Sequence, residues 1–228
     1  MPPQNNYITK ILSMPLVKNG LQNLIDKYYG IQLKEIKATA QTVNCITFPR
    51  VNDIKRDCIN QLQLRERPKI LITKELRGIN ALALHIDKQP HILLSPKSAI
   101  SLSDGELKFL LGHELGHIMQ GNLICHLANG LLQNMQKKAD VLGAMLADLI
   151  EIPLKNWCRD NEYKADVAGL MCCQDIEHVY SLMAKVAKSE QQSMAPSLME
   201  IYKDHPMIAN RLKRLEQYRF LNIHQYEN

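Results

Sequence analysis

The sequence predicts an α+β fold in which helices are in the clear majority. Three short apolar runs, at residues 69–73, 82–86 and 91–95, have the length of strands and are bounded by proline, glycine or polar residues. Longer stretches before and after them repeat their apolar residues with the period of a helix. A small sheet packed against several helices is therefore expected.

The chain is expected to divide into an N-terminal helical extension, residues 1–50, and a main domain, residues 51–228. Its 228 residues, 46% of them hydrophobic, suffice for one domain with a sizeable core. The first expected helix runs from Pro15 to Tyr29, with Gly30 as its stop, and the second is capped by Asn52 or Asp53 and ended by Pro68. Further helices are expected at 104–120, in an inserted segment at about 123–155, in a stretch that includes residues 159–170, at 176–189 and at 206–220.

The helix at 104–120 has clear boundary signals. Ser103 and Glu106 form a capping box at its start, and Gly121 with Asn122 provides a C-terminal stop. Its positions are mostly apolar, so the helix is expected to be buried.

This helix contains the motif HExxH, since residues 113–117 read HELGH. Two histidines four residues apart lie on one face of a helix, so His113 and His117 can both reach one ion. A lone buried histidine is usually a hydrogen-bonded core residue. Two histidines with Glu114 between them in an apolar wall need partners, however, and a divalent cation satisfies all three.

A third ligand is available downstream, where Glu162 and Asp166 lie four residues apart in a helical pattern. Glu162 can complete a set of two histidines and one glutamate, and Asp166 can accept the distal N–H of His113 and fix its tautomer. The alternative is an ordinary solvated acidic face. Apolar neighbours at 167–170 argue against that alternative.

Four motifs in this order resemble the gluzincin zinc metallopeptidases of the CAAX prenyl endopeptidase and HtpX type. Upstream of HELGH, the run NALAL at 80–84 followed by ILLS at 92–95 is similar to the family's Asn-Ala-Phe-Ala segment and the strand after it. Downstream, His205-Pro206 and then Arg211-Leu212 resemble its His-Pro and Arg-Leu pairs. The resemblance covers about residues 80–215.

The resemblance implies a zincin-like catalytic domain in which the HExxH helix packs on the helix that carries the glutamate ligand. One Zn²⁺ per chain would be held by His113, His117 and Glu162, with Asp166 as the carboxylate behind His113. His205 and Arg211 would flank the reacting centre. A solvated basic face on the last helix is the alternative for Arg211.

The expected activity is hydrolysis of peptide bonds in extended protein segments. Zinc would lower the pKa of its bound water, Glu114 would take the proton and later pass it to the leaving amine, and His205 would donate to the developing oxyanion. Two alternatives stay open. The first is a catalytically silent module that binds peptides or proteins on the same fold. The second is a deformylase-like amidase, which would need an upstream cysteine ligand.

An extended substrate is expected to add to a sheet edge as an extra strand. The run 91–95 is the expected rim, and family analogy points to Asn80 and Ala81 as the lip of the cleft, although both could simply pack at the start of a strand. His85 and His91 are expected to be surface or rim residues.

Composition limits which classes of binding partner and which cellular compartment are expected for this chain. A net charge of +5 with interleaved signs does not favour a nucleic-acid partner. The six cysteines form no CxxC spacing, so reduced thiols are expected. The N-terminus lacks the pattern of a signal peptide, and the most apolar stretch, 141–154, is too short to span a bilayer. A soluble, cytoplasmic protein is the expectation.

Overall fold

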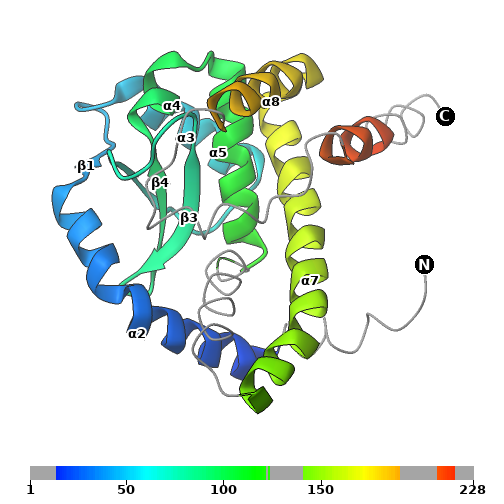
Figure 1. Cartoon of the computed structure of the whole chain (residues 1–228). Helices are drawn as coiled ribbons and strands as arrows, with labels where there is room; N and C mark the ends of the chain where they lie inside the picture. The colour runs from blue at the N-terminus through cyan, green and yellow to red at the C-terminus, as the bar shows by residue number, and fades with distance from the viewer. Residues whose placement is uncertain (1–13, 122, 124–140, 191–209, 219–228) are drawn as a thin grey trace.

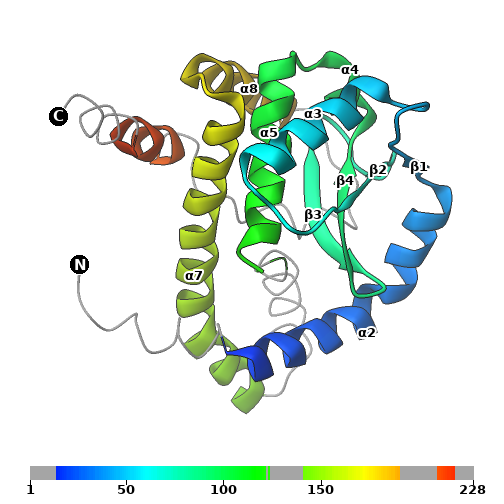
Figure 2. The ribbon, with the colours of Figure 1, turned by 180° about the vertical axis from the view of Figure 1, so that it is seen from behind.

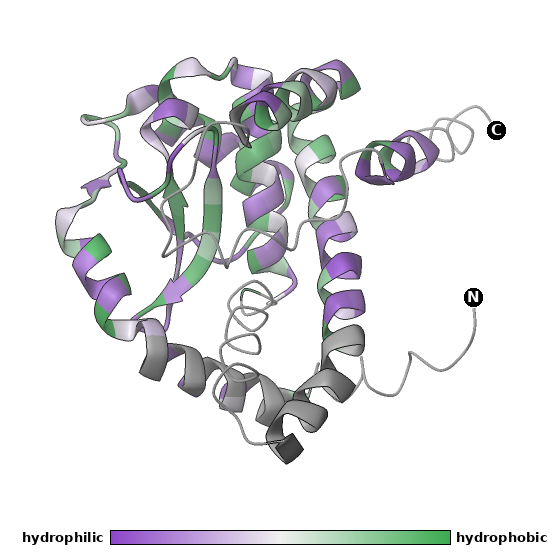
Figure 3. Ribbon diagram, in the orientation of Figure 1, coloured by the Kyte–Doolittle hydropathy of each residue, from purple (hydrophilic) through white to green (hydrophobic). Residues whose placement is uncertain are grey.

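The computed structural model describes residues 14–121, 123, 141–190 and 210–218 (Figure 1). Within these residues the fold is mostly helical α+β, with one four-stranded sheet. This agrees with the predicted fold class. Figure 3 shows hydrophobic residues on β3 (Ala81–Ile86), on β4 (Gln89–Leu94) and on much of α5 (Asp104–Met119). Hydrophilic segments interrupt α5.

The sheet has the strand order β1-β2-β4-β3. β2 pairs parallel with β4, whereas β3 and β4 form an antiparallel hairpin whose register runs from Ala81↔Leu94 to Ile86↔Gln89. The three predicted strands are present, and a fourth of two residues was not predicted because it is too short to show a period. The bounds are β1 Gln41–Thr42, β2 Lys69–Ile72, β3 Ala81–Ile86 and β4 Gln89–Leu94.

The expectation that the run 91–95 forms the rim of the sheet is wrong. Among the described strands, β4 lies between β2 and β3, and β3 is one of the two edge strands. The apolar side chains of β4 explain its central place, because Ile92, Leu93 and Leu94 are all fully buried and a strand paired on both sides buries them best.

Side chains that alternate along the strands build two cores, one on each face of the sheet. On one face, Ala81, Ala83 and Ile92 belong to a cluster with residues of α3 (Pro49–Gln61) and α5. On the other face, the cluster joins strand residues to α2 (Pro15–Thr39) and α7 (Val141–Cys173). Its members include Leu33, Leu82, Leu84, Leu93 and Trp157. Figure 2 shows α3 and α5 beside the sheet, with α2 crossing below them.

The N-terminal helix α2 runs Pro15–Thr39, so Gly30 does not end it. Gly30 lacks the positive φ of a C-terminal glycine, which Gly78 and Gly121 have. Beyond Gly30 the helix buries Leu33 and Ile36 against the sheet, and this burial outweighs the roughly 1 kcal/mol that a glycine costs inside a helix. The predicted division of the chain at residue 50 stays a prediction.

Helix α3 runs Pro49–Gln61 and starts earlier than the predicted cap at Asn52 or Asp53. Pro49 occupies the first turn, where its fixed φ suits a helix and its missing N–H costs nothing. The next residue, Arg50, donates to the carbonyls of Ala99 and Leu102. A short helix, α4 Pro96–Ser101, was not predicted, although Ser95 caps it with its side chain.

Helix α5 runs Asp104–Met119 and has the predicted capping box between Ser103 and Glu106. Glu106 also accepts hydrogen bonds from Ser181 and Lys185 of α8, which runs Ile176–Glu190 as predicted. Burial alone would raise the pKa of Glu106, but these bonds and the charge of Lys185 lower it from 4.5 to about 2. The carboxylate therefore fastens α8 to the start of α5.

Helix α7 runs Val141–Cys173 without a break. The described part of the predicted insertion, 141–155, is thus the first half of the helix that carries Glu162, and residues 124–140 lie outside the described part. None of the described helices combines the length and apolar character needed to cross a membrane. Of the predicted last helix, residues 210–218 are helical, and 206–209 and 219–220 lie outside the described residues.

Five cysteines fall within the described residues, and all are free thiols. Cys45 is exposed, and the other four are buried, namely Cys58, Cys158, Cys172 and Cys173. Cys125 lies outside the described residues.

Candidate metal centre

The centre depends on how closely α5 and α7 approach each other. A Cβ on Gly116 would lie 2.9 Å from the Cα of Ala165, and one on Gly112 would lie 2.8 Å from the Sγ of Cys172. A Cβ on Gly169 of α7 would lie 2.8 Å from the carbonyl oxygen of Phe109. Glycines on both helices therefore let the two backbones touch, and this contact brings a side chain of α7 within reach of the histidines of α5.

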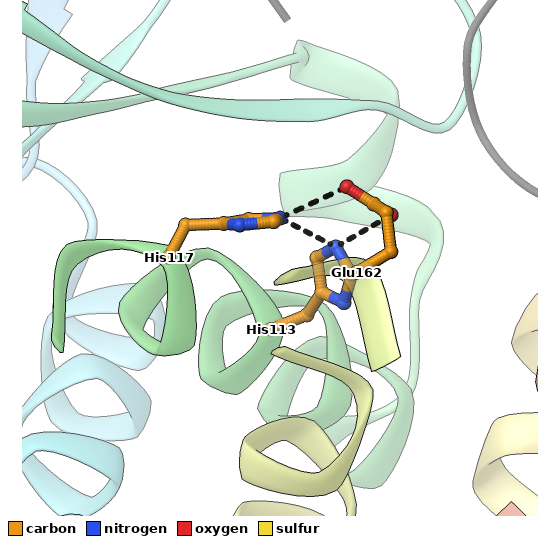
Figure 4. Close-up of side chains that lie close together, drawn as sticks. All are labelled: His113, His117 and Glu162. Carbon is orange, nitrogen blue, oxygen red and sulfur yellow. Dashed lines mark hydrogen bonds and ion pairs between the residues drawn. The ribbon is translucent and has the colours of Figure 1, made fainter. Parts of the chain in front are cut away.

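The side chains of His113, His117 and Glu162 converge on one point (Figure 4). The two Nε2 atoms of the histidines are 3.1 Å apart. Oε2 of Glu162 lies 3.6 Å from His113 Nε2, and Oε1 of Glu162 lies 3.2 Å from His117 Nε2. All three residues are at least 97% buried. The predicted ligands are therefore brought together.

This geometry fits a zinc ion. Ligands at about 2.0–2.1 Å in a tetrahedral arrangement are separated from each other by about 3.4 Å. The shortest contacts between the three side chains, 3.1 to 3.6 Å, are close to that value, with the two histidines facing different oxygens of the Glu162 carboxylate. With one ligand atom taken from each residue, all three atoms lie within 4.8 Å of one another. Two imidazoles and one carboxylate are also the donor set of catalytic zinc sites that keep one coordination position open.

Asp166 lies directly behind His113. Its Oδ1 is 2.9 Å from His113 Nδ1, and the side chain is fully buried. A carboxylate at Nδ1 keeps the proton on that nitrogen and leaves Nε2 free to bind a metal. Burial alone would lower the pKa of His113, but the bond to Asp166 and the charge of Glu162 outweigh it and raise that pKa.

Arg211, on the helix at 210–218, pairs with Asp166 through two hydrogen bonds. Its Nε donates to Asp166 Oδ2 at 2.8 Å, and its Nη2 donates to Oδ1. Burial alone would raise the pKa of Asp166, but the charge and hydrogen bonds of Arg211 lower it. Arg211 is itself 92% buried, so the alternative of a solvated basic face is wrong for this residue.

Glu114 is buried next to the ligands and faces the sheet. One oxygen of its carboxylate, Oε2, accepts a hydrogen bond of 2.6 Å from the backbone N–H of Ala83 on β3. Nothing in the sequence singles out Ala83 as a donor, because a backbone donor leaves no signature in the residue type.

Asn80 and Ala81, the expected lip of the substrate cleft, lie at the start of β3. Asn80 and Ala81 are both buried, and the backbone of Asn80 is tied down by Ser98, whose Oγ accepts from its N–H and donates to its carbonyl. Among the described residues, none donates a hydrogen bond to Asn80 Oδ1. His205 lies outside the described residues.

The expectation of a surface or rim position is wrong for His91, which is 99% buried. Its Nδ1 lies 2.9 Å from the carbonyl of Gln89, and burial lowers its pKa, so the ring is held neutral inside the protein. His85 on the edge strand is half-buried.

Comparisons with known proteins agree with this site. The model of Peptidase family M48 matches residues 46–219. The plastoglobule-localized metallopeptidase 48 of Arabidopsis thaliana, a chloroplastic protein, is 31% identical over 109 residues, which are 47% of this chain and 32% of that protein. The crystal structure of S. mikatae Ste24p aligns with a TM-score of 0.42 and 15% identity, covering 93% of this chain and 65% of that chain. The chain thus spans about a third of the first relative and less than two thirds of the second.

Proposed function

Because this chain belongs to peptidase family M48, we propose that it is a zinc-dependent metalloendopeptidase that hydrolyses peptide bonds in extended protein segments. The observation that supports this most is the convergence of His113, His117 and Glu162 beside a buried Glu114. These residues would hold one Zn²⁺ per chain. When bound, zinc lowers the pKa of a coordinated water and polarises a carbonyl.

Glu114 is the proposed general base. It follows the first histidine on α5, and its second oxygen stays available because Ala83 occupies only Oε2. A carboxylate in this place can take a proton from the attacking water and return it to the leaving amine. His205 is the proposed donor to the oxyanion, by the family resemblance alone.

Asp166 and Arg211 are proposed as positioning residues. Asp166 fixes the tautomer and orientation of His113, and Arg211 keeps Asp166 ionised and in place through two hydrogen bonds. Neither residue would touch the substrate.

The proposed substrate site is the edge of β3 with which no described strand pairs. This strand packs on α5, where its residue Ala83 contacts Glu114, the neighbour of His113 in sequence. An edge strand can accept an extended peptide as an additional strand. The Oδ1 atom of Asn80 is a suitable acceptor for a substrate N–H, since the described residues offer it no donor, and Ala81 lies beside it on the strand.

Both alternatives from the sequence are less well supported. A catalytically silent peptide-binding module would have no use for a buried, hydrogen-bonded Glu114. A deformylase-like amidase would need a cysteine ligand, whereas the metal-binding group in the described residues is completed by Glu162. The expected cytoplasmic location and the absence of a nucleic-acid partner stay predictions.

The experiment measures zinc content and cleavage of casein or peptides by the wild type, Glu114→Gln and Glu162→Ala. Glu114→Gln should retain zinc and lose cleavage by about two to four orders of magnitude, because the amide cannot accept the proton. Glu162→Ala should lose zinc as well. The control is Glu35→Gln, an exposed position on α2, which should match the wild type. A wild type that binds zinc and cleaves nothing would favour the binding module.

A further inference from the structure

The backbone N–H of Ala83 points away from β4, toward the edge of β3 with which no described strand pairs. In an antiparallel pair, residues that exchange hydrogen bonds alternate with residues that do not. Ser95 N–H donates to the carbonyl of Asn80, and the register from Ala81↔Leu94 continues from this pair. By alternation, Leu82 bonds to Leu93 on β4, whereas Ala83 does not bond to β4.

The free N–H of Ala83 is used by Glu114 instead. The distance of 2.6 Å from Ala83 N to Glu114 Oε2 is short, and both residues are at least 95% buried. Among the described residues, the carboxylate of Glu114 receives no other hydrogen bond. A glutamate side chain has three rotatable bonds, so this contact restricts where its oxygens lie.

A strand backbone is a good anchor for a general base. The peptide N–H of Ala83 cannot swing away, because β3 is fixed by the hairpin with β4 and Ala83 is packed in the core that includes α5. Donors that are already in place when the reaction begins need no reorganisation.

We propose that the peptide N–H of Ala83 is a positioning group that holds Oε2 of Glu114 and thereby aims the other oxygen at the attacking water. This inference rests on the proposed function, because it assigns a task to the same general base. It also implies that a substrate strand on β3 cannot use this N–H.

Amide hydrogen exchange on the zinc-loaded protein, followed by NMR, tests the contact without any catalytic assay. An N–H at a free sheet edge exchanges fast unless it has a partner. The Ala83 amide should be protected in the wild type and in Glu114→Gln, whose amide oxygen still accepts, and should exchange at least about ten-fold faster in Glu114→Ala. Fast exchange in the wild type, or unchanged protection in Glu114→Ala, would overturn the proposal.

A backbone ester tests the catalytic consequence. Replacing Ala83 by lactic acid removes its N–H and keeps its side chain, and kcat should fall about ten-fold or more while KM and zinc content stay the same. The matched control replaces Leu93 by its α-hydroxy analogue, which weakens the adjacent Leu82–Leu93 bond of the ladder. That control should lower Tm and keep kcat.

An unchanged or higher kcat in the Ala83 ester would overturn the positioning role, even if the contact exists. A wild type that is inactive on every substrate would instead refute the proposed function and the positioning role together. The exchange experiment still decides in that case whether Ala83 holds Glu114.

Discussion

At the scale of single residues, Asp166 organises the polar groups behind the metal ligands. It is fully buried, it bonds to Nδ1 of His113, and it receives two hydrogen bonds from Arg211. The buried charge of Asp166 is tolerated because His113 and Arg211 are both bonded to it. Replacing one of the three residues would leave a buried polar group without its partner.

Asp166→Asn should weaken both the metal site and the fold. The amide does not hold His113 in the tautomer that frees Nε2, so zinc affinity should fall about 10- to 100-fold. Arg211 loses its counter-charge in a buried place, which should cost about 3–5 kcal/mol of unfolding free energy. Chelator competition measures the affinity, and denaturant unfolding measures the stability.

Asp160→Asn is the control, because Asp160 lies on the same helix and is exposed. It should change neither quantity. Unaltered zinc affinity in Asp166→Asn would show that His113 is oriented by something other than this carboxylate.

The sequence predicted the residues of the centre well, because their chemistry depends on side-chain type and helical spacing. His113, His117, Glu162 and Asp166 lie together as the four-residue spacing implied. The contact between Ala83 and Glu114 could not be predicted from the sequence. It depends on which strand lies at the edge of the sheet and not on the side chain at position 83.

At the scale of elements, the contact of α5 with α7 determines whether three side chains can share one ion. Gly112 and Gly116 lie four residues apart on α5, and Ala165 and Gly169 lie four apart on α7, so each pair occupies one face of its helix. Glycines inside helices normally reduce stability, and here they allow a close approach.

Gly116→Ala should push α7 away from α5. The added methyl group would lie 2.9 Å from Ala165 Cα, where backbone has to move. Overpacking of this kind costs about 1–3 kcal/mol. Zinc affinity should fall as well, because Glu162 lies on the displaced helix, and Co²⁺ spectra of the variant would report the altered ligand geometry.

Gly30→Ala is the matched control, a glycine-to-alanine change in a helix with nothing within 4 Å of the new atom. It should stabilise the protein by about 0.5–1 kcal/mol and leave the metal site as it is. If Gly116→Ala behaved like Gly30→Ala, the two helices would not be in the close contact described.

At the scale of the whole molecule, helix α5, which carries His113 and His117, packs against both the sheet and the long helix α7. The periodicity of apolar residues in the sequence predicted most of these helices and strands but not their order in space. The central place of β4 and the continuation of α2 through Gly30 both follow from burial against distant residues, which no local signal records. The predicted insertion likewise proved, from residue 141 on, to be the same helix that carries Glu162.

The central claim is that one ion is shared by side chains from α5 and α7. Anomalous scattering at the zinc edge, measured on crystals of the zinc-loaded protein, tests it most directly. We expect one peak per chain, within about 2.0–2.2 Å of His113 Nε2, His117 Nε2 and a carboxylate oxygen of Glu162. A peak at other residues, or an ion bound by the histidines with Glu162 turned away, would contradict it.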